Sequence, residues 1–299
     1  MPLASAAASL PNLTVQQLEY LTAVADAPTW AVAAAGVGVT PSALSQGLAE
    51  LERRVGLPLF ERDGRRRVLA PAAAPVLAHA RDVLARTADL ARYADHVRDG
   101  RTGTLRVGMI DAAAVDHFSH VLRRFRARRP ELDLRLTVAN SAALLDQLRR
   151  SELDLVVCVE PPAANPAVTT LALLSEPMLV LAPDRRALER PPRQWGPWVT
   201  FPAEAHSRLV IERALRRRGA AFDVIAESHQ PEVLREMVRV GLGWTVLPAG
   251  RPRDAANLAV GEHLVDRRLV LARRAQALPN PAGDTFVLAL HGAVDALDP

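Results

Sequence analysis

Apolar and polar residues follow a helical period over the first part of the chain. Thr14 and, three places later, Gln17 match a capping box, and the apolar residues that follow share one helix face until Pro28. A second short helix is predicted over residues 29–35. The pattern therefore predicts two consecutive helices that are separated at Pro28.

A third helix is predicted after a glycine turn. Gly36 and Gly38 supply the turn, and Thr40-Pro41 is typical of a helix start. The outer face of this helix is small and polar, which favours a helix-turn-helix whose last helix enters the DNA major groove. A plain three-helix bundle has the same spacing. The inner, apolar stripe consists of Leu44, Leu48, Leu51 and Val55.

A basic segment follows the third helix. Residues 58–67 join the apolar anchor Pro58-Leu59-Phe60 to an Asp63-Gly64 turn and contain four arginines. We interpret this segment as a wing. Beside a recognition helix, its arginines favour contact with DNA phosphates, and the alternative is a solvated surface loop.

Residues 75–97 form one long predicted helix with a seven-residue apolar repeat. Charged residues occupy its other faces, so we expect the helix to pair with a copy of itself. The alternative is that it packs along its own C-terminal domain. The predicted dimerisation positions are Val76, Val83, Leu90 and Val97.

Beyond a short linker at residues 100–103, predicted strands and helices alternate. Such alternation is typical of βαβ units on a parallel sheet and predicts two α/β lobes with a ligand cleft at the strand ends. Two further apolar runs, 269–272 and 285–290, return the chain to the first lobe, and we interpret residues 191–198 as a rigid surface loop. The expected strands lie at 105–110, 132–138, 153–159, 178–182, 222–226 and 244–247, and the expected helices at 115–127, 142–149, 208–218 and 232–240.

Composition excludes several kinds of chemistry. The 299 residues are 49% apolar and 23% charged, which is typical of an ordinary globular protein of two or three domains. All 37 basic residues are arginine, so a P-loop, a pyridoxal enzyme and a Ser-x-x-Lys hydrolase are excluded because each requires a lysine. The net charge of +4 permits nucleic-acid binding without establishing it.

The single cysteine, Cys158, excludes an intramolecular disulfide and suits a reducing cytoplasm. It lies in an apolar strand, where we expect an inert, buried thiol. The eight histidines show no metal-ligand spacing, and the glycines at 36–38 and 241–243 do not complete a dinucleotide loop. We see no signal-peptide pattern and no apolar run of about 18 residues. A soluble, cytoplasmic protein without enzymatic activity, metal or cofactor is therefore expected.

The stretch from Thr14 to Arg67 resembles the signature of the LysR family of bacterial transcriptional regulators in order and spacing. The resemblance continues more weakly through residues 105–108, 153–155 and 241–248, so it covers nearly the whole chain. The segments that carry it most strongly are 17–21, 33–34, 39–46, 51–52 and 55–62.

This resemblance implies a multidomain α and α/β fold. A winged helix-turn-helix would occupy residues 12–69 and a dimerisation helix 70–100. A two-lobed domain similar to type 2 periplasmic binding proteins would occupy 104–299. Lobe 1 would comprise about 104–180 and 266–299, and lobe 2 about 181–265.

The resemblance also implies a sequence-specific regulator that binds double-stranded DNA and is modulated by a small-molecule effector between the lobes. Dimers, tetramers and contact with RNA polymerase would follow, and no membrane partner is expected. Three alternatives stay open: a degenerate regulator with weak DNA specificity or no effector, a solute-binding protein, and an enzyme. The solute-binding protein would require export.

Two residues depart from the family pattern where bases would be read. Pro41 stands where a glutamine is common, and Gln46 stands where an arginine is common, so Gln46 would favour adenine over guanine. We expect the serines and Gln46 to face bases and the arginines to face phosphates. The expected DNA-binding residues are Thr40, Pro41, Ser42, Ser45, Gln46, Arg53, Arg62, Arg65 and Arg66.

At the expected effector site, Asp111 stands where the family commonly has serine or threonine. A carboxylate there would disfavour an acidic effector and suit a cation or a hydroxyl donor. Asn140-Ser141 opens a helix whose free N–H groups suit an anion or a polar group, unless the pair is only a helix cap. The candidate effector-binding residues are Asp111, Ala112, Asn140, Ser141, Glu160, Phe201, His206, Ser228 and His229.

Overall fold

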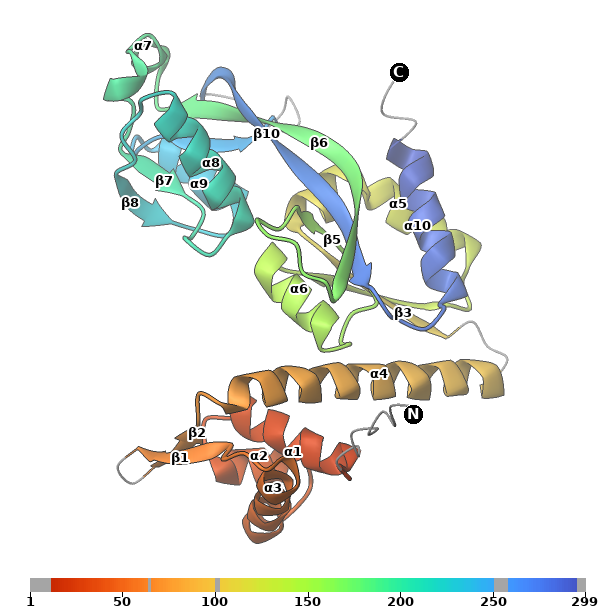
Figure 1. Ribbon diagram of the computed structural model, residues 1–299. Coiled ribbons are helices and arrows are strands. Elements are labelled where there is room, and N and C mark those ends of the chain that lie inside the picture. Colours follow the sequence, from red (N-terminus) through yellow and green to blue (C-terminus); the bar gives the residue numbers. More distant parts are fainter. Residues whose placement is uncertain (1–11, 64–65, 100–102, 250–257, 295–299) are drawn as a thin grey trace, which may run out of the picture. The chain divides into compact units, whose positions relative to one another are not determined.

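The computed structural model describes residues 12–63, 66–99, 103–249 and 258–294 (Figure 1). The chain divides into two compact units, residues 1–92 and 93–299. The long helix α4 (Ala73–Asp99) contains the boundary between them. Each unit is described by itself.

The first unit begins with three short helices, α1 (Val15–Asp26), α2 (Trp30–Gly36) and α3 (Pro41–Val55). The predicted capping box at α1 is confirmed, because Thr14 Oγ1 accepts the Gln17 N–H at 3.2 Å and the Gln17 side chain accepts the Thr14 N–H at 3.1 Å. Threonine hydroxyls cap α2 and α3 in the same way. Gly56 ends α3 at φ +74°, a left-handed conformation that glycine adopts without strain.

A β-hairpin follows α3, as the wing interpretation predicted. Strand β1 (Phe60–Asp63) pairs antiparallel with β2 (Arg66–Leu69), with Phe60 opposite Leu69. The core beneath the hairpin and helices is aliphatic. The predicted stripe of Leu44, Leu48 and Leu51 is fully buried there, together with Leu21 and Leu59.

The first part of α4 packs into the core of the first unit. Ala73 and Ala80 are buried in that core, and Val76 and Val83 pack half-buried against it. Leu90 lies further along the helix and is 58% exposed. The side chain of Val97 lies outside the described residues. Of the predicted dimerisation stripe, Leu90 therefore has a side chain open to solvent.

The second unit is built on one six-stranded sheet in the order β4-β3-β5-β10-β6-β9. The strands β4, β3 and β5 run parallel, and the long strands β10 and β6 pair antiparallel and cross from one lobe to the other (Figure 1). The bounds are β3 (Thr104–Met109), β4 (Asp133–Val138), β5 (Leu155–Val159), β6 (Val168–Ala182), β9 (Thr245–Pro248) and β10 (Ala259–Arg274).

Lobe 1 is the part of the second unit that surrounds β3, β4 and β5. Its helices are α5 (Ser119–Arg128), α6 (Ser141–Arg149) and α10 (Pro281–Val294). Helices α5 and α10 pack together through an edge-to-face contact of Phe125 and Phe286, whose ring centres lie 4.9 Å apart. The predicted helix over 115–127 is wrong in one respect: a π-helical segment, η1 (Ala113–His117), precedes α5, and the fully buried Phe118 separates the two.

Lobe 2 contains a two-stranded parallel sheet of β7 and β8. Its core is aromatic: Trp195 stacks on Trp244 with ring centres 5.7 Å apart, and Trp198 is fully buried beside them. The surface-loop interpretation of 191–198 is therefore wrong, because the indoles turn inward. The elements are β7 (Trp198–Thr200), β8 (Val224–Glu227), α7 (Arg185–Leu188), η2 (Pro192–Gln194), α8 (His206–Arg217) and α9 (Pro231–Arg239).

The crossing strands are much longer than their apolar runs predicted. Strand β6 begins ten residues before Met178, and β10 extends from Ala259 to Arg274 rather than over 269–272. Both strands carry largely exposed stretches, at residues 169–172 and 260–263, outside the predicted apolar runs. Pairing between the two strands, from Ala259 opposite Ala182 to Arg274 opposite Val168, stabilises these stretches instead.

Candidate DNA-binding and effector sites

The start of α3 presents a small, uncharged surface. Pro41, Ser42 and Gln46 are exposed, whereas Ser45 is half-buried. Thr40 is exposed too, but its hydroxyl accepts the Ala43 N–H at 3.2 Å and so caps the helix. Of the predicted base-reading groups, Ser42 and Gln46 are thus the most accessible side chains.

Arg53, predicted to contact phosphate, is held by a carboxylate on the same helix. Glu50 Oε2 accepts from Arg53 Nε at 2.8 Å, and Glu50 Oε1 accepts from Arg53 Nη2 and from Arg54 Nε, each at 2.5 Å. These hydrogen bonds, from Arg53 first and then Arg54, lower the pKa of Glu50 from 4.5 to about 2. Sequence reasoning missed Glu50, although spacings of three and four residues on a helix signal such pairs.

Two arginines of the wing lie at paired positions on its two strands. Arg62 lies directly opposite Arg67 across the hairpin, and its exposed side chain makes no ion pair within the described part of the chain. Arg65 lies outside the described residues. Arg66 begins β2, but its side chain is not described.

Glu52 and Arg67 form a network that sequence reasoning missed. Glu52 Oε1 accepts the backbone N–H groups of Leu59 and Phe60 at 2.9 and 3.1 Å, and Glu52 Oε2 accepts from Arg67 Nη2 at 2.8 Å. The Arg67 Cζ lies 5.2 Å from the ring centre of Trp30 and 5.0 Å from that of Phe60. The guanidinium therefore packs against α2 and the start of β1 while it pairs with α3.

In lobe 1, the chain after β3 carries the first candidate effector residues. Asp111 is exposed and Ala112 is buried. Partial burial raises the pKa of Asp111, and the negative charges of Glu232 and Asp116 raise it further. Because Glu232 lies in the first turn of α9 in lobe 2, a carboxylate of lobe 2 raises the pKa of one in lobe 1 across the lobe junction.

Two lobe 1 candidates already have structural partners. Asn140 Oδ1 accepts the Ala143 N–H at 2.9 Å and caps α6, and Ser141 Oγ accepts the Val159 N–H at 3.2 Å. Ser141 is buried, so its hydroxyl ties the start of α6 to the end of β5. Glu160, the next residue, is exposed and lies 3.6 Å from Arg268.

The lobe 2 candidates lie in different surroundings. Phe201 is 5% exposed and belongs to the core of lobe 2. His206 Nδ1 lies 3.2 Å from the carbonyl oxygen of Val159, which joins the start of α8 to lobe 1. Ser228 Oγ accepts the Gln230 N–H at 3.1 Å, and exposed His229 lies 3.3 Å from Glu204. The structure thus brings His206 to the lobe junction and leaves Phe201 inside lobe 2.

A buried charged network connects the lobes, and no local motif predicts it. Glu176 on β6 accepts from Arg267 Nε on β10 at 2.6 Å and lies 2.9 Å from His117 Nε2 of η1. Arg267 Nη1 also donates to Ser207 Oγ on α8 at 2.9 Å. Burial alone would raise the pKa of Glu176, but the His117 hydrogen bond and the charge and hydrogen bond of Arg267 outweigh it, so this pKa lies below 4.5.

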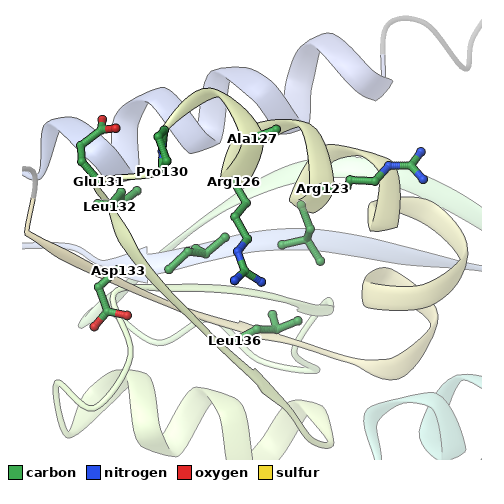
Figure 2. A pocket seen from close by; sticks show the side chains of 10 residues that line it. Arg123, Arg126, Ala127, Pro130, Glu131, Leu132, Asp133 and Leu136 are labelled. Atoms are coloured by element: carbon green, nitrogen blue, oxygen red, sulfur yellow. The ribbon is translucent and has the colours of Figure 1, made fainter.

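A groove of about 980 Å³ lies on lobe 1 between α5 and the edge strand β4 (Figure 2). Leucines form much of its wall, and Arg126 extends into it. It contains none of the predicted effector residues. Its lining is Leu122, Arg123, Arg126, Ala127, Pro130, Glu131, Leu132, Asp133, Leu134 and Leu136.

Three further observations bear on chemistry. Among the described residues, no cluster of three His, Cys, Asp or Glu side chains is arranged to hold a metal ion. The described helices include none long and apolar enough to cross a membrane. Cys158 is fully buried, and burial raises the pKa of its thiol to about 12.

A winged helix-turn-helix joined to a two-lobed α/β unit defines a DNA-binding regulator with a ligand-binding domain. Family models agree with this class. Residues 15–74 match the bacterial regulatory helix-turn-helix proteins of the lysR family, and residues 98–295 match the LysR substrate binding domain. The chain belongs to the LysR family.

Similar proteins are named as regulators of transcription or activators of genes. The chain is 29% identical to the regulator CbbR of Rhodospirillum rubrum over 84% of each chain. It is 31% identical to a probable hydrogen peroxide-inducible genes activator of Streptomyces viridosporus, over 79% of this chain and 77% of the relative. The predicted function, a LysR-type transcriptional regulator with an effector-binding domain, is confirmed.

Solved structures share the fold across both units. A full-length OxyR variant of Pseudomonas aeruginosa matches with a TM-score of 0.61 at 22% identity, covering 94% of each chain. CbnR in complex with its target DNA matches with a TM-score of 0.60 at 18% identity, covering 94% of this chain and all of CbnR. The predicted multidomain fold class is confirmed.

Proposed function

We propose that this regulator reads DNA bases with the start of α3 and holds the DNA backbone with arginines of the wing. The observation that carries the proposal is the contrast between the uncharged start of α3, where Ser42 and Gln46 are exposed, and the exposed Arg62 of the wing, which has no ion pair among the described residues. Amide and hydroxyl groups identify bases, whereas arginines bind phosphates of any sequence. The fold shared with DNA-bound CbnR supports the proposal.

The remaining predicted DNA contacts follow the same division. Ser45 assists base readout from its half-buried position beside Gln46, while Thr40 and Pro41 set the start of the helix. Arg65 and Arg66 are assigned to phosphates from the sequence. Arg53 reaches a phosphate after it releases Glu50.

A mobility-shift titration on the regulator's own upstream intergenic DNA tests this division. Gln46→Ala should lose affinity for that DNA and little for random DNA, because it removes about 1–3 kcal/mol of base discrimination. Arg62→Ala should weaken binding to the upstream DNA and to random DNA by the same factor. The control is Arg123→Met, which removes an exposed arginine of lobe 1. Equal binding of both DNAs by the unaltered protein would instead indicate a degenerate reader.

We propose that α4 mediates self-association into dimers and tetramers. Leu90, 58% exposed on a 27-residue helix whose sequence has a seven-residue apolar repeat, supports this proposal. Val97 belongs to the same predicted stripe, and Val76 and Val83 support the helix from within the first unit. Leu90→Glu should shift the sedimentation coefficient towards the monomer, and an unchanged value would contradict this role.

For the effector, we propose a small cation at the lobe junction. The negative charge of Glu232 of lobe 2 contributes to the raised pKa of Asp111 of lobe 1, and neither carboxylate makes an ion pair within the described part of the chain. A bound cation would relieve this repulsion and bring the lobes together. His206 lies at the same junction, and Asn140, Glu160, Ser228 and His229 are the further candidates for polar contacts.

Calorimetry with two probes of equal length tests the charge of the effector site. Putrescine, a diamine, should bind the purified regulator, and succinate, a dicarboxylate, should not. Asp111→Asn should weaken putrescine binding at least tenfold, the effect of about 1.4 kcal/mol. Preference for succinate would contradict a cationic effector while leaving DNA recognition intact.

The family's role in transcription supports two further proposals. The regulator acts in the bacterial cytoplasm, where it meets DNA and RNA polymerase, and it has no catalytic activity of its own. Co-purification of RNA polymerase with the regulator bound to its upstream DNA tests the proposed contact with the polymerase. Polymerase that is recruited equally without the regulator would contradict it.

A further inference from the structure

We propose that Arg67 is a positioning residue of the wing, which fixes the hairpin on α3 and keeps Arg62 free to bind the DNA backbone. Arg67 itself does not touch DNA. This inference rests on the phosphate contact proposed for Arg62. It assigns separate roles to two arginines that lie opposite each other on one hairpin.

The guanidinium of Arg67 already has partners on several sides. It donates to Glu52 Oε2 at 2.8 Å and packs within about 5 Å of the ring centres of Trp30 and Phe60, two rings that meet edge to face. A planar guanidinium suits this place because it pairs with a carboxylate while it packs on aromatic faces. The printed partners hold one N–H of Nη2 and the flat faces of the guanidinium, so a phosphate would have to compete with Glu52 for the positive charge of Arg67.

Glu52 connects this arrangement to the recognition helix. One of its carboxylate oxygens accepts two backbone N–H groups at the start of β1, and the other accepts from Arg67. The wing is thus attached to α3 at its first strand through Glu52 and at its second strand through Arg67. We therefore expect a change in this network to alter the direction in which the hairpin leaves the helix.

Arg62 depends on the same carboxylate. Residues directly opposite in an antiparallel pair share a face, with Cβ atoms about 4.5–5.5 Å apart, so Arg62 and Arg67 emerge side by side. Glu61 and Asp63 project from the other face because neighbouring strand residues alternate. Arg67 occupies Glu52 and repels Arg62 towards solvent. Without Arg67, we expect Arg62, which shares that face of the hairpin, to pair with Glu52.

A double-mutant cycle on the full chain tests this dependence. Fluorescence anisotropy with labelled upstream DNA, at several NaCl concentrations, compares the unaltered protein with Arg62→Ala, Arg67→Met and the double variant. Each single variant should reduce the slope of log K against log salt by about 0.9 for each bound subunit. The double variant should bind no more weakly than Arg62→Ala. Additive losses would overturn the proposal, because Arg67 would then contact DNA itself.

The variant Arg67→Lys adds an independent readout. A lysine preserves a direct phosphate contact but cannot reproduce the planar packing of Arg67 on Trp30 and Phe60, so Arg67→Lys should behave like Arg67→Met. A salt slope restored by lysine would contradict the positioning role. Methionine keeps apolar packing on the two rings, and lysine provides a second folded variant should methionine unfold the unit. Arg123→Met, the charge-matched control, should leave the slope unchanged.

Failure of the underlying function gives a different result. If Arg62→Ala leaves affinity and salt slope unchanged, the proposed phosphate contact of Arg62 is wrong, and the positioning role falls with it. If Arg62→Ala weakens binding but the losses add, the phosphate contact stands and only the positioning role is wrong. Circular dichroism of each variant at the assay temperature verifies that the helices are intact.

Discussion

Two arginine–carboxylate pairs, one from each unit, lie in opposite surroundings. In the first unit, the side chain of Glu50 is 33% exposed and that of its partner Arg53 is 71% exposed. In the second unit, the side chains of Glu176 and Arg267 are each 5% exposed. Water screens the first pair and is largely excluded from the second. We infer that the exposed Glu50–Arg53 pair affects DNA binding, because it occupies an arginine on the recognition helix. The buried Glu176–Arg267 pair affects folding stability and the packing of the two lobes.

The largest loss of folding stability is expected when the buried Glu176–Arg267 pair is broken. Arg267→Met leaves the Glu176 carboxylate buried without its cation, so the free energy of unfolding should fall by about 3–5 kcal/mol. Urea denaturation followed by circular dichroism measures this change. The double variant Glu176→Gln with Arg267→Met should recover part of the loss, because it removes the uncompensated charge. A loss below about 1 kcal/mol in the single variant would contradict this prediction, because exposed ion pairs contribute no more than that.

A smaller effect should appear as the pH falls. The pKa of Glu176 is below 4.5 in the folded chain, so its ionised form stabilises the fold above about pH 4.5, and this contribution is lost as the pH falls through the folded pKa. The urea midpoint of the unaltered protein should therefore drop more steeply between pH 6 and pH 3 than that of Glu176→Gln. Parallel curves would show that Glu176 does not gain stability from its partners.

Removing the exposed carboxylate should change binding and leave stability nearly unaltered. Glu50→Gln releases Arg53 and Arg54, so DNA affinity at 0.1 M salt should rise about three- to tenfold and the salt dependence should steepen. The matched control is Glu236→Gln, which breaks a similar exposed pair with Arg239 on lobe 2. If both variants bind DNA equally well, the Glu50 pair has no influence on the DNA-binding surface.

The smallest effect is expected for Cys158, whose buried thiol should be unreactive in the folded protein. Burial raises the pKa of Cys158 to about 12, so the reactive thiolate is scarce at neutral pH. Native protein should not react with Ellman's reagent, urea should release one thiol per chain, and hydrogen peroxide should not alter DNA binding. Similarity to a probable activator of hydrogen peroxide-inducible genes makes this test informative. Rapid labelling of the native chain would show that lobe 1 opens to solvent.

Sequence reasoning succeeded where the signal is local. Capping residues and the apolar stripe of α3 predicted the helices of the first unit, because each lies within a few residues of its partners. Such reasoning also could have found Glu50, which pairs three and four residues along one helix. The wing hairpin was predicted from its turn, but the role of Arg67 was not, since Glu52 lies 15 residues away.

The contacts at the lobe junction could not be predicted from the sequence, because they join residues that are far apart along the chain. His117 and Arg267 meet Glu176 across 59 and 91 residues of sequence. The pairing of β6 with β10 places Arg267 opposite Glu176, and η1 of lobe 1 supplies His117. Phe201 was chosen by its position in the family pattern, but the ring packs in the core of lobe 2, as apolar side chains do when a core is within reach.

The tryptophans are distributed so that the chain carries its own optical probe. Trp195, Trp198 and Trp244 lie in the core of lobe 2, and the fourth, Trp30, lies in the first unit, so lobe 1 contributes no indole emission. Replacing Trp30 with phenylalanine would confine the fluorescence to lobe 2. An effector that disturbs the lobe 2 side of the junction would then change the emission colour or intensity, and one that disturbs lobe 1 alone would be spectroscopically silent.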